Sequence, residues 1–202
     1  MKFIRGLLLF LIVFIAVLFI GKGIFVVSSI NSSSTSPVAS TVVSTALENP
    51  EIVRKIPVRL RVPSLNIEAQ SESVGMDDQG RMDVPKNIVN VAWYQLGVTP
   101  GEKGNAVFAG HYDKPDGSPA VFYNLKKLES GDEIIVEAED GTQLTFMVTE
   151  VRVVKLSEFP LQEVFGETNK TRVNLITCGG IWDRAKKEYS ERSIVFSELK
   201  NT

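Results

Sequence analysis

The apolar and polar positions of this chain follow three different patterns, and the first is a long apolar run near the N-terminus. The run covers residues 7–27 with Lys22 as its one charged residue, and Lys2 and Arg5 precede it. Its length matches the roughly 20 residues that cross a bilayer, and Lys22 can extend to the lipid head groups. The basic residues before the run predict a cytoplasmic N-terminus. Residues 1–27 are therefore predicted to be a cytoplasmic start and a transmembrane signal anchor.

A cleaved signal peptide is the alternative interpretation of this run. No small-x-small cleavage site follows soon after Ile20, however, which favours an uncleaved anchor. The chain after residue 27 is then predicted to lie outside the cell membrane.

The second pattern covers residues 28–51, where Ser and Thr dominate and no helical period is present. Such a segment cannot bury enough apolar surface to offset the conformational entropy lost on ordering. It is predicted to be a flexible stalk that separates a domain from the membrane.

The third pattern begins near residue 52, where apolar residues alternate with polar ones in short stretches typical of β-strands. Val58, Leu60 and Val62 alternate in this way between Pro57 and Pro63. Prolines in these places indicate strand ends or a sheet edge.

The clearest predicted hairpin covers residues 134–148. Apolar residues alternate on both sides of Asp140-Gly141, a dipeptide favoured in two-residue type I′ turns. Further strands are predicted at residues 105–109, 172–177 and 193–199, and short helices at 120–125 and 161–165. Residues 52–202 are therefore predicted to form one mainly β domain, a closed seven- or eight-stranded barrel with one or two short helices.

Composition excludes several classes of function. The net charge is −2 and no Lys/Arg cluster is present, so nothing indicates nucleic-acid binding. The single cysteine excludes an intrachain disulfide framework and cysteine-rich zinc sites. Cys178 and His111 make a poor zinc ligand set, even with Asp113 or Asp116. We therefore predict no metal and no cofactor.

Cys178 is the candidate nucleophile. It lies at the end of the predicted strand in VNLITCGG, and Gly179 and Gly180 leave room beside it for a substrate backbone. A buried structural thiol is the alternative, because free cysteine is among the most buried residue types. In an extracytoplasmic domain, however, an idle thiol is a liability. These observations favour a thiol enzyme.

A thiol nucleophile needs a partner that helps generate the thiolate and protonates the leaving amine. His111, the only histidine, follows a short apolar strand and a glycine, and it suits this role. Arg192 precedes the predicted strand at 193–199 and carries a permanent charge with several N–H donors, which can stabilise an oxyanion. The alternative for each is an ordinary surface residue. Arg184, six residues after Cys178, is the competing arginine.

Together these segments resemble the sortases, membrane-anchored cysteine transpeptidases of mainly Gram-positive bacteria. The segment Leu175-Ile176-Thr177-Cys178 resembles the family's L-x-T-C signature, and Ala109-Gly110-His111 resembles its histidine segment. Arg192-Ser193-Ile194-Val195 is similar to its arginine before the last strand, and residues 121–125 stand where the family often has F-x-x-L. The resemblance covers about residues 56–200 and the anchor. The phrases GNAVFAGH, FYNLKKLESGDE and LITCGGIWD are most similar to class F, with class D or E as alternatives.

The resemblance implies a sorting reaction in a sortase-like barrel. Cys178 would attack the Thr–Gly bond of an LPxTG-like C-terminal signal in a secreted protein and form a thioester acyl-enzyme. Arg192 would hold the oxyanion and the substrate, and His111 would protonate the leaving group. An amine from a peptidoglycan precursor or a pilin would then release the product. The enzyme would lie in the cell membrane with its catalytic domain, residues 52–202, outside.

Two other functions are weighed against this one. A papain-like peptidase places its cysteine before its histidine and at a helix start, whereas here the order is reversed and the cysteine follows a strand. A non-catalytic, membrane-tethered β-domain that binds a cell-wall or adhesion partner would explain the anchor, stalk and strands. It would leave the placement of the single cysteine and single histidine as coincidence.

Overall fold

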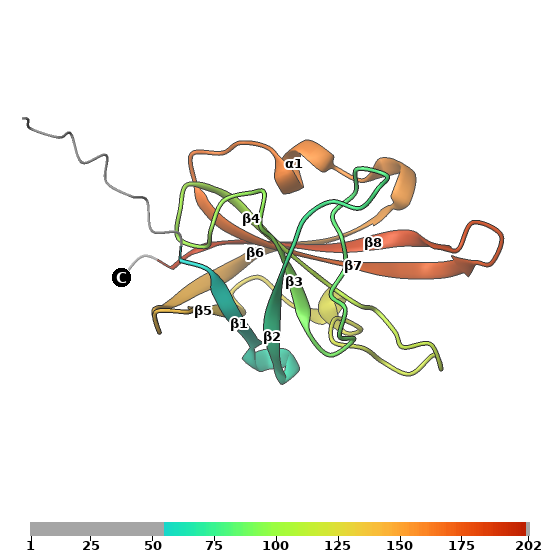
Figure 1. The fold of residues 1–202 in the computed structure, drawn as a ribbon, viewed down its shortest axis with the longest axis horizontal. Helices are drawn as coiled ribbons and strands as arrows, with labels where there is room; N and C mark the ends of the chain where they lie inside the picture. The colour runs from blue at the N-terminus through green and yellow to red at the C-terminus, as the bar shows by residue number, and fades with distance from the viewer. Residues whose placement is uncertain (1–54, 201–202) are drawn as a thin grey trace, which may run out of the picture. The chain divides into compact units, whose positions relative to one another are not determined.

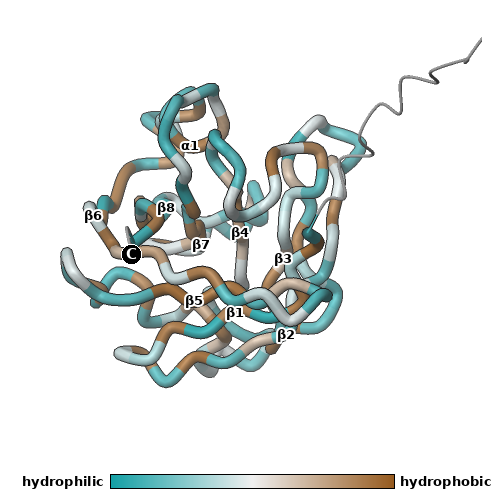
Figure 2. The backbone as a smooth tube through the Cα atoms, turned by 90° about the vertical axis from the view of Figure 1, so that its left-hand side faces the viewer, coloured by the Kyte–Doolittle hydropathy of each residue, from teal (hydrophilic) through white to brown (hydrophobic). Residues whose placement is uncertain are grey.

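The computed structural model describes residues 55–200, and this part of the chain contains eight β-strands. They are β1 (Pro57–Val62), β2 (Ile67–Val74), β3 (Val91–Tyr94), β4 (Gly104–Gly110), β5 (Glu133–Ala138), β6 (Gln143–Lys155), β7 (Thr171–Asp183) and β8 (Glu188–Leu199). The strands form a closed barrel in the order β1-β2-β3-β4-β7-β8-β6-β5, which the labels follow around the ring in Figure 2. The prediction of a mainly β, closed barrel with few helices is confirmed.

Two strand pairs in the barrel are parallel, and one of them decides where the chemistry lies. β2 pairs with β3, and β4 pairs with β7, in parallel, while the other neighbours are antiparallel. A parallel pair needs a long connection, and the chain between β4 and β7 includes β5, β6 and α1 (Leu161–Phe165). As a result, the C-terminal end of β4 and the middle of β7 lie side by side.

The inward-facing residues of the strands fill the barrel. Alternate residues of a strand point to opposite faces, and along β7 the side chains of Val173 and Leu175 are fully buried in the core. The same parity places Cys178 on the outer face of the sheet. Other large buried core side chains are Leu60, Val91, Trp93, Phe108, Phe122, Phe146 and Val195.

The helix that the sequence predicts at residues 161–165 is present as α1. It packs on the outer face of the sheet formed by β4, β7 and β8 (Figure 1). Val164 packs there in a second apolar cluster with Val107, Ile194 and Phe196. The buried Asn174 donates its side-chain amide to the carbonyl of Val164 at 2.9 Å. This hydrogen bond offsets part of the cost of burying the amide nitrogen, and it links α1 to β7.

Two predicted local details are wrong. The predicted helix at residues 120–125 is instead a series of turns followed by the 3₁₀ helix η2 (Leu125–Lys127). The hairpin between β5 and β6 is confirmed, but its turn is not type I′. Within this turn only Gly141 has a positive φ, 79°, whereas a type I′ turn needs two such residues. The Ala138 N–H donates to the carbonyl of Thr142, so the loop has three residues. The remaining 3₁₀ helices are η1 (Pro63–Leu65) and η3 (Leu156–Glu158).

The predicted anchor, residues 1–27, and the predicted stalk, residues 28–51, lie outside the described residues. Between residues 55 and 200, no helix combines the length and apolar character that a membrane crossing needs.

Candidate active site

The three candidate residues lie in one row across the adjacent strands β4, β7 and β8. Cys178 and Arg192 are direct partners in the antiparallel β7–β8 pair. In the parallel β4–β7 pair, Ala109 is aligned with Ile176, and continuing this register by two residues places His111 beside Cys178. Neighbouring strands lie about 4.8 Å apart. The structure therefore gathers a histidine, a cysteine and an arginine that are far apart in the sequence.

The sequence predicts all three residues at strand ends. His111 does follow the end of β4 at Gly110, but Cys178 and Arg192 lie within their strands. β7 continues five residues past Cys178 to Asp183, and β8 begins at Glu188, before Arg192. The two strands project as a long hairpin on the right of Figure 1. Pairing resumes at Trp182 with Tyr189 after a bulge in the register.

Gly180 makes this bulge possible. Its φ is 77°, a backbone conformation that favours glycine. A Cβ atom there would also collide with the side chains of Ser190 and Glu191. The two glycines that follow Cys178 therefore extend the hairpin past the cysteine instead of ending the strand.

The sulfur of Cys178 is partly buried, and two charges act on it. Burial raises the pKa of the Cys178 thiol, the positive charge of Arg192 opposes this rise, and the carboxylate of Asp113 adds to it. With a raised pKa, the thiolate is the minor form near neutral pH, and its fraction grows as the pH increases. Arg192 is thus the group that favours the reactive form.

This environment predicts how Cys178 reacts with a thiol alkylator. Iodoacetamide is expected to label Cys178 in the folded protein, but more slowly than after unfolding in urea. The labelling rate is expected to keep increasing with pH beyond about 8.5, the pKa of a free thiol. Labelling followed by mass spectrometry across a pH series measures both. Labelling only after unfolding would instead favour the non-catalytic binding domain.

His111 is oriented by a backbone carbonyl that the sequence does not reveal. Its Nε2 lies 3.1 Å from the carbonyl oxygen of Pro85. A carbonyl can only accept, so Nε2 carries the proton and Nδ1 is the atom that can exchange a proton with a reacting group. The segment after Pro85 is held in turn by Glu72 of β2, which accepts hydrogen bonds from the backbone N–H groups of Lys86 and Asn87.

The end of β4 is tied to β7 directly below the row. The buried Thr177 donates its hydroxyl to the carbonyl of Gly110 at 2.8 Å, immediately before His111. Gly110 has no space for a side chain, because a Cβ atom would approach the Phe122 ring to 2.5 Å. Both contacts fix the backbone from which His111 extends, and they give Thr177 a structural role.

The structure separates the two competing arginines. Arg192 donates through Nη1 to the carbonyls of Glu191, at 2.8 Å, and Tyr189, at 3.1 Å. The Nε and Nη2 groups of Arg192 have no hydrogen-bond acceptor within residues 55–200, so they are free to bind an oxyanion. Arg184 lies in the turn of the hairpin, about 15 Å along the strand from Cys178 at the usual rise per residue.

Beyond the row, two residues that the sequence did not single out as a pair contact each other. The Tyr189 hydroxyl donates to the carboxylate of Asp113, and burial together with this hydrogen bond raises the pKa of Tyr189 to about 12. The rings of Tyr112 and Trp182 both pack against the ring of Tyr189, with centroids 5.5 and 5.0 Å away. The only feature of the sequence that points to this contact is that Asp113 follows His111 by two residues.

No group of three or more metal-binding side chains gathers anywhere in residues 55–200.

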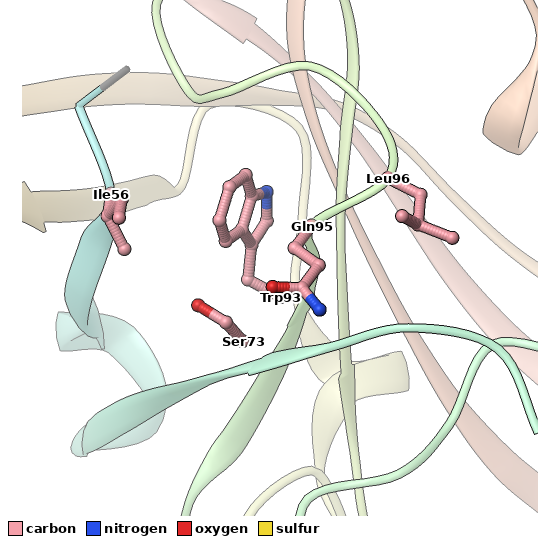
Figure 3. Close-up of a pocket in the computed structure, with 5 residues that line it drawn as sticks. All are labelled: Ile56, Ser73, Trp93, Gln95 and Leu96. Atoms are coloured by element: carbon pink, nitrogen blue, oxygen red, sulfur yellow. The ribbon is translucent and has the colours of Figure 1, made fainter. Parts of the chain in front are cut away.

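Two hollows of the domain lie away from the row. The first hollow has a volume of about 270 Å³ and is lined by the residues shown in Figure 3: Ile56, Ser73, Trp93, Gln95 and Leu96. A second, of about 300 Å³, lies between η1 and the segment around Ala120. Neither is lined by His111, Cys178 or Arg192. The row instead lies on the outer face of the sheet, where Cys178 is only partly buried.

Comparison with known proteins identifies the family and fold of this domain. The sortase domain family matches residues 60–200. Similar solved structures include sortase C from Clostridium perfringens, which is 20% identical with a TM-score of 0.53, covering 74% of this chain and 72% of that one. A lid mutant of sortase A from Corynebacterium diphtheriae is 19% identical with a TM-score of 0.55, covering 76% and 75%. Sortase C-1 from Actinomyces oris is 23% identical with a TM-score of 0.54, covering 71% and 73%. At these identities the structures show a shared fold, and no curated protein matches the sequence.

Proposed function

Because this chain belongs to the sortase family of cysteine transpeptidases, we propose that it cleaves an LPxTG-like sorting signal through a thioester on Cys178. The protein held in this thioester is then transferred to an amine of a peptidoglycan precursor or a pilin. The observation that carries this proposal is the row of His111, Cys178 and Arg192 on three neighbouring strands. The phrases around these residues support a class F-like member of the family.

In the first half-reaction, the Cys178 thiolate attacks the threonine carbonyl carbon of the signal. The carbonyl oxygen becomes an oxyanion, and the free N–H groups of Arg192 stabilise it. The C–N bond then breaks, the leaving amine takes a proton from Nδ1 of the His111 imidazolium, and a thioester remains. The Pro85 carbonyl accepts from the Nε2–H group, which leaves Nδ1 as the nitrogen that gives up its proton.

The proposal places this domain outside the cell membrane. The apolar run and basic start of residues 1–27 support a signal anchor with a cytoplasmic N-terminus. Residues 28–51 then act as a stalk that gives the domain reach over the membrane surface. Such a placement brings the active site near the secreted proteins and cell-wall precursors on which it acts.

The test is a transfer assay with the purified full chain in mild detergent. An LPxTG-like peptide is incubated with the protein, with and without glycinamide as the amine. We expect cleavage between Thr and Gly in both cases, and a Thr–glycinamide product only when the amine is present. Mass spectrometry of the products measures this. An intact peptide after prolonged incubation, across several variants of the motif, would refute the proposed function.

A further inference from the structure

The hairpin side of the row carries a carboxylate that does not help the nucleophile form. The charge of Asp113 raises the pKa of Cys178 and so opposes the thiolate. Its one side-chain hydrogen bond within residues 55–200 comes from the Tyr189 hydroxyl, and no Lys or Arg in that range forms an ion pair with it. Attack on the sorting signal therefore gives no reason for this negative charge beside the sulfur.

The carboxylate is held in place by both neighbouring segments. On the side of β8, Tyr189 donates to it. On its own side, a tight loop pairs Asp113 with Pro119, and the backbone N–H of Lys114 donates to the carbonyl of Ser118 at 2.8 Å. Asp113 is thus part of a built arrangement and not a freely rotating surface group.

Aromatic rings pack around Tyr189, whose hydroxyl holds the carboxylate. Tyr112 stacks on Tyr123 with centroids 4.8 Å apart and meets Tyr189 edge to face at 5.5 Å, while Trp182 packs on Tyr189. Burial raises the pKa of Tyr112, and the charges of Asp113 and Glu191 add to the rise, so both carboxylates lie near this ring. Aromatic faces attract cations, and a carboxylate beside them strengthens that attraction.

We propose that Asp113, with the rings of Tyr112, Tyr189 and Trp182, binds the protonated primary amine that accepts the acyl group. This inference rests on the proposed function and concerns its second half-reaction. The ammonium would be held beside the thioester on the hairpin side of Cys178, opposite the side that α1 covers.

The ammonium loses one proton to the neutral His111 that the first half-reaction left behind. The amine nitrogen attacks the thioester carbon, the C–N bond forms and the C–S bond breaks. The second nitrogen proton passes to the departing Cys178 sulfur, which leaves an amide, a thiol and an imidazolium.

The experiment compares how the acyl-enzyme divides between an amine and water. The full chain is incubated with an LPxTG-like peptide and either glycinamide, which is cationic, or hydroxylamine, which is uncharged near neutral pH. For each nucleophile, the ratio of transfer to hydrolysis is measured chromatographically. Asp113→Asn is expected to lower the glycinamide ratio about tenfold, as expected for losing one exposed ion pair and weakening the cation–π contacts. The hydroxylamine ratio is expected to fall by a clearly smaller factor.

Two further variants separate binding from folding. Tyr189→Phe keeps the ring and removes the hydrogen bond to Asp113, so the glycinamide ratio should fall, but less than in Asp113→Asn. The control is Asp116→Asn, which removes the same charge from the same loop. Within residues 55–200 the Asp116 side chain accepts hydrogen bonds only from Ser118. The glycinamide ratio of this variant should match that of the wild type.

The results that overturn this inference are distinct. Equal falls for glycinamide and hydroxylamine in Asp113→Asn would show that Asp113 positions His111 or Cys178 and does not bind the cation. An unchanged glycinamide ratio would exclude the site directly. Failure of the wild-type protein to cleave the peptide at all would refute the proposed function, and this inference with it.

Discussion

Replacing Cys178 with alanine is expected to abolish cleavage of an LPxTG-like peptide and lower kcat by at least about 10⁴-fold. Cys178 is the only cysteine of the chain, so no second thiol can replace it. Ser193, the residue after Arg192, is buried and faces into the barrel, so its hydroxyl cannot substitute for the sulfur on the outer face. Continuous assay of a fluorogenic peptide measures the loss.

The fold should tolerate this change, which makes the result informative. Cys178 is only partly buried, and the alanine removes a single sulfur atom from the outer face. The expected destabilisation is about 1 kcal/mol or less, so the melting temperature should stay close to that of the wild type. Retained turnover in a folded Cys178→Ala protein would mean that another group attacks the peptide.

Replacing Arg192 with alanine should lower turnover by roughly 10²–10³-fold, the usual cost of losing one oxyanion donor. A second effect acts in the same direction. Because the Arg192 charge lowers the pKa of Cys178, its removal raises that pKa further and reduces the thiolate fraction near neutral pH. The pH dependence of Cys178 alkylation should therefore move to higher pH in this variant.

The matched control is Arg184→Ala, which removes the same charge from the turn of the same hairpin. Its turnover should stay near the wild-type value, because Arg184 lies several residues beyond the row. Arg192→Lys separates charge from geometry: it keeps the positive charge but not the planar fork of donors, and it should recover only part of the activity. The opposite pattern, with turnover lost only in Arg184→Ala, would show that the wrong arginine is assigned.

Much of the barrel follows from local sequence pattern. The alternation in residues 134–148 and the apolar positions of residues 161–165 are signals within one element, and the hairpin and α1 both form there. Val58 shows the limit of such signals. It follows the alternation of Leu60 and Val62, yet it is 39% exposed, because the pairing of β1 with β5 shifts between Pro57 and Arg59.

The details of the site depend on contacts between distant segments, and no local pattern encodes them. The sequence indicates Cys178, His111 and Arg192 through residue type and order. It places all three at strand ends, which is right for His111 and wrong for the other two. The glycine bulge at Gly180 extends the hairpin only because β8 pairs beyond it. Likewise, the contact of His111 with Pro85 and that of Asp113 with Tyr189 exist only after the barrel closes.

The central claim is that Cys178 carries the acyl group, and trapping the acyl-enzyme tests it most directly. The wild-type chain is incubated briefly with an LPxTG-like peptide, quenched in acid, and analysed by intact-mass and peptide-mapping mass spectrometry. The row of His111, Cys178 and Arg192 predicts an adduct with the mass of the peptide up to its threonine, attached at Cys178 and removed by hydroxylamine. Peptide cleaved with no adduct, or an adduct on any other residue, would contradict it.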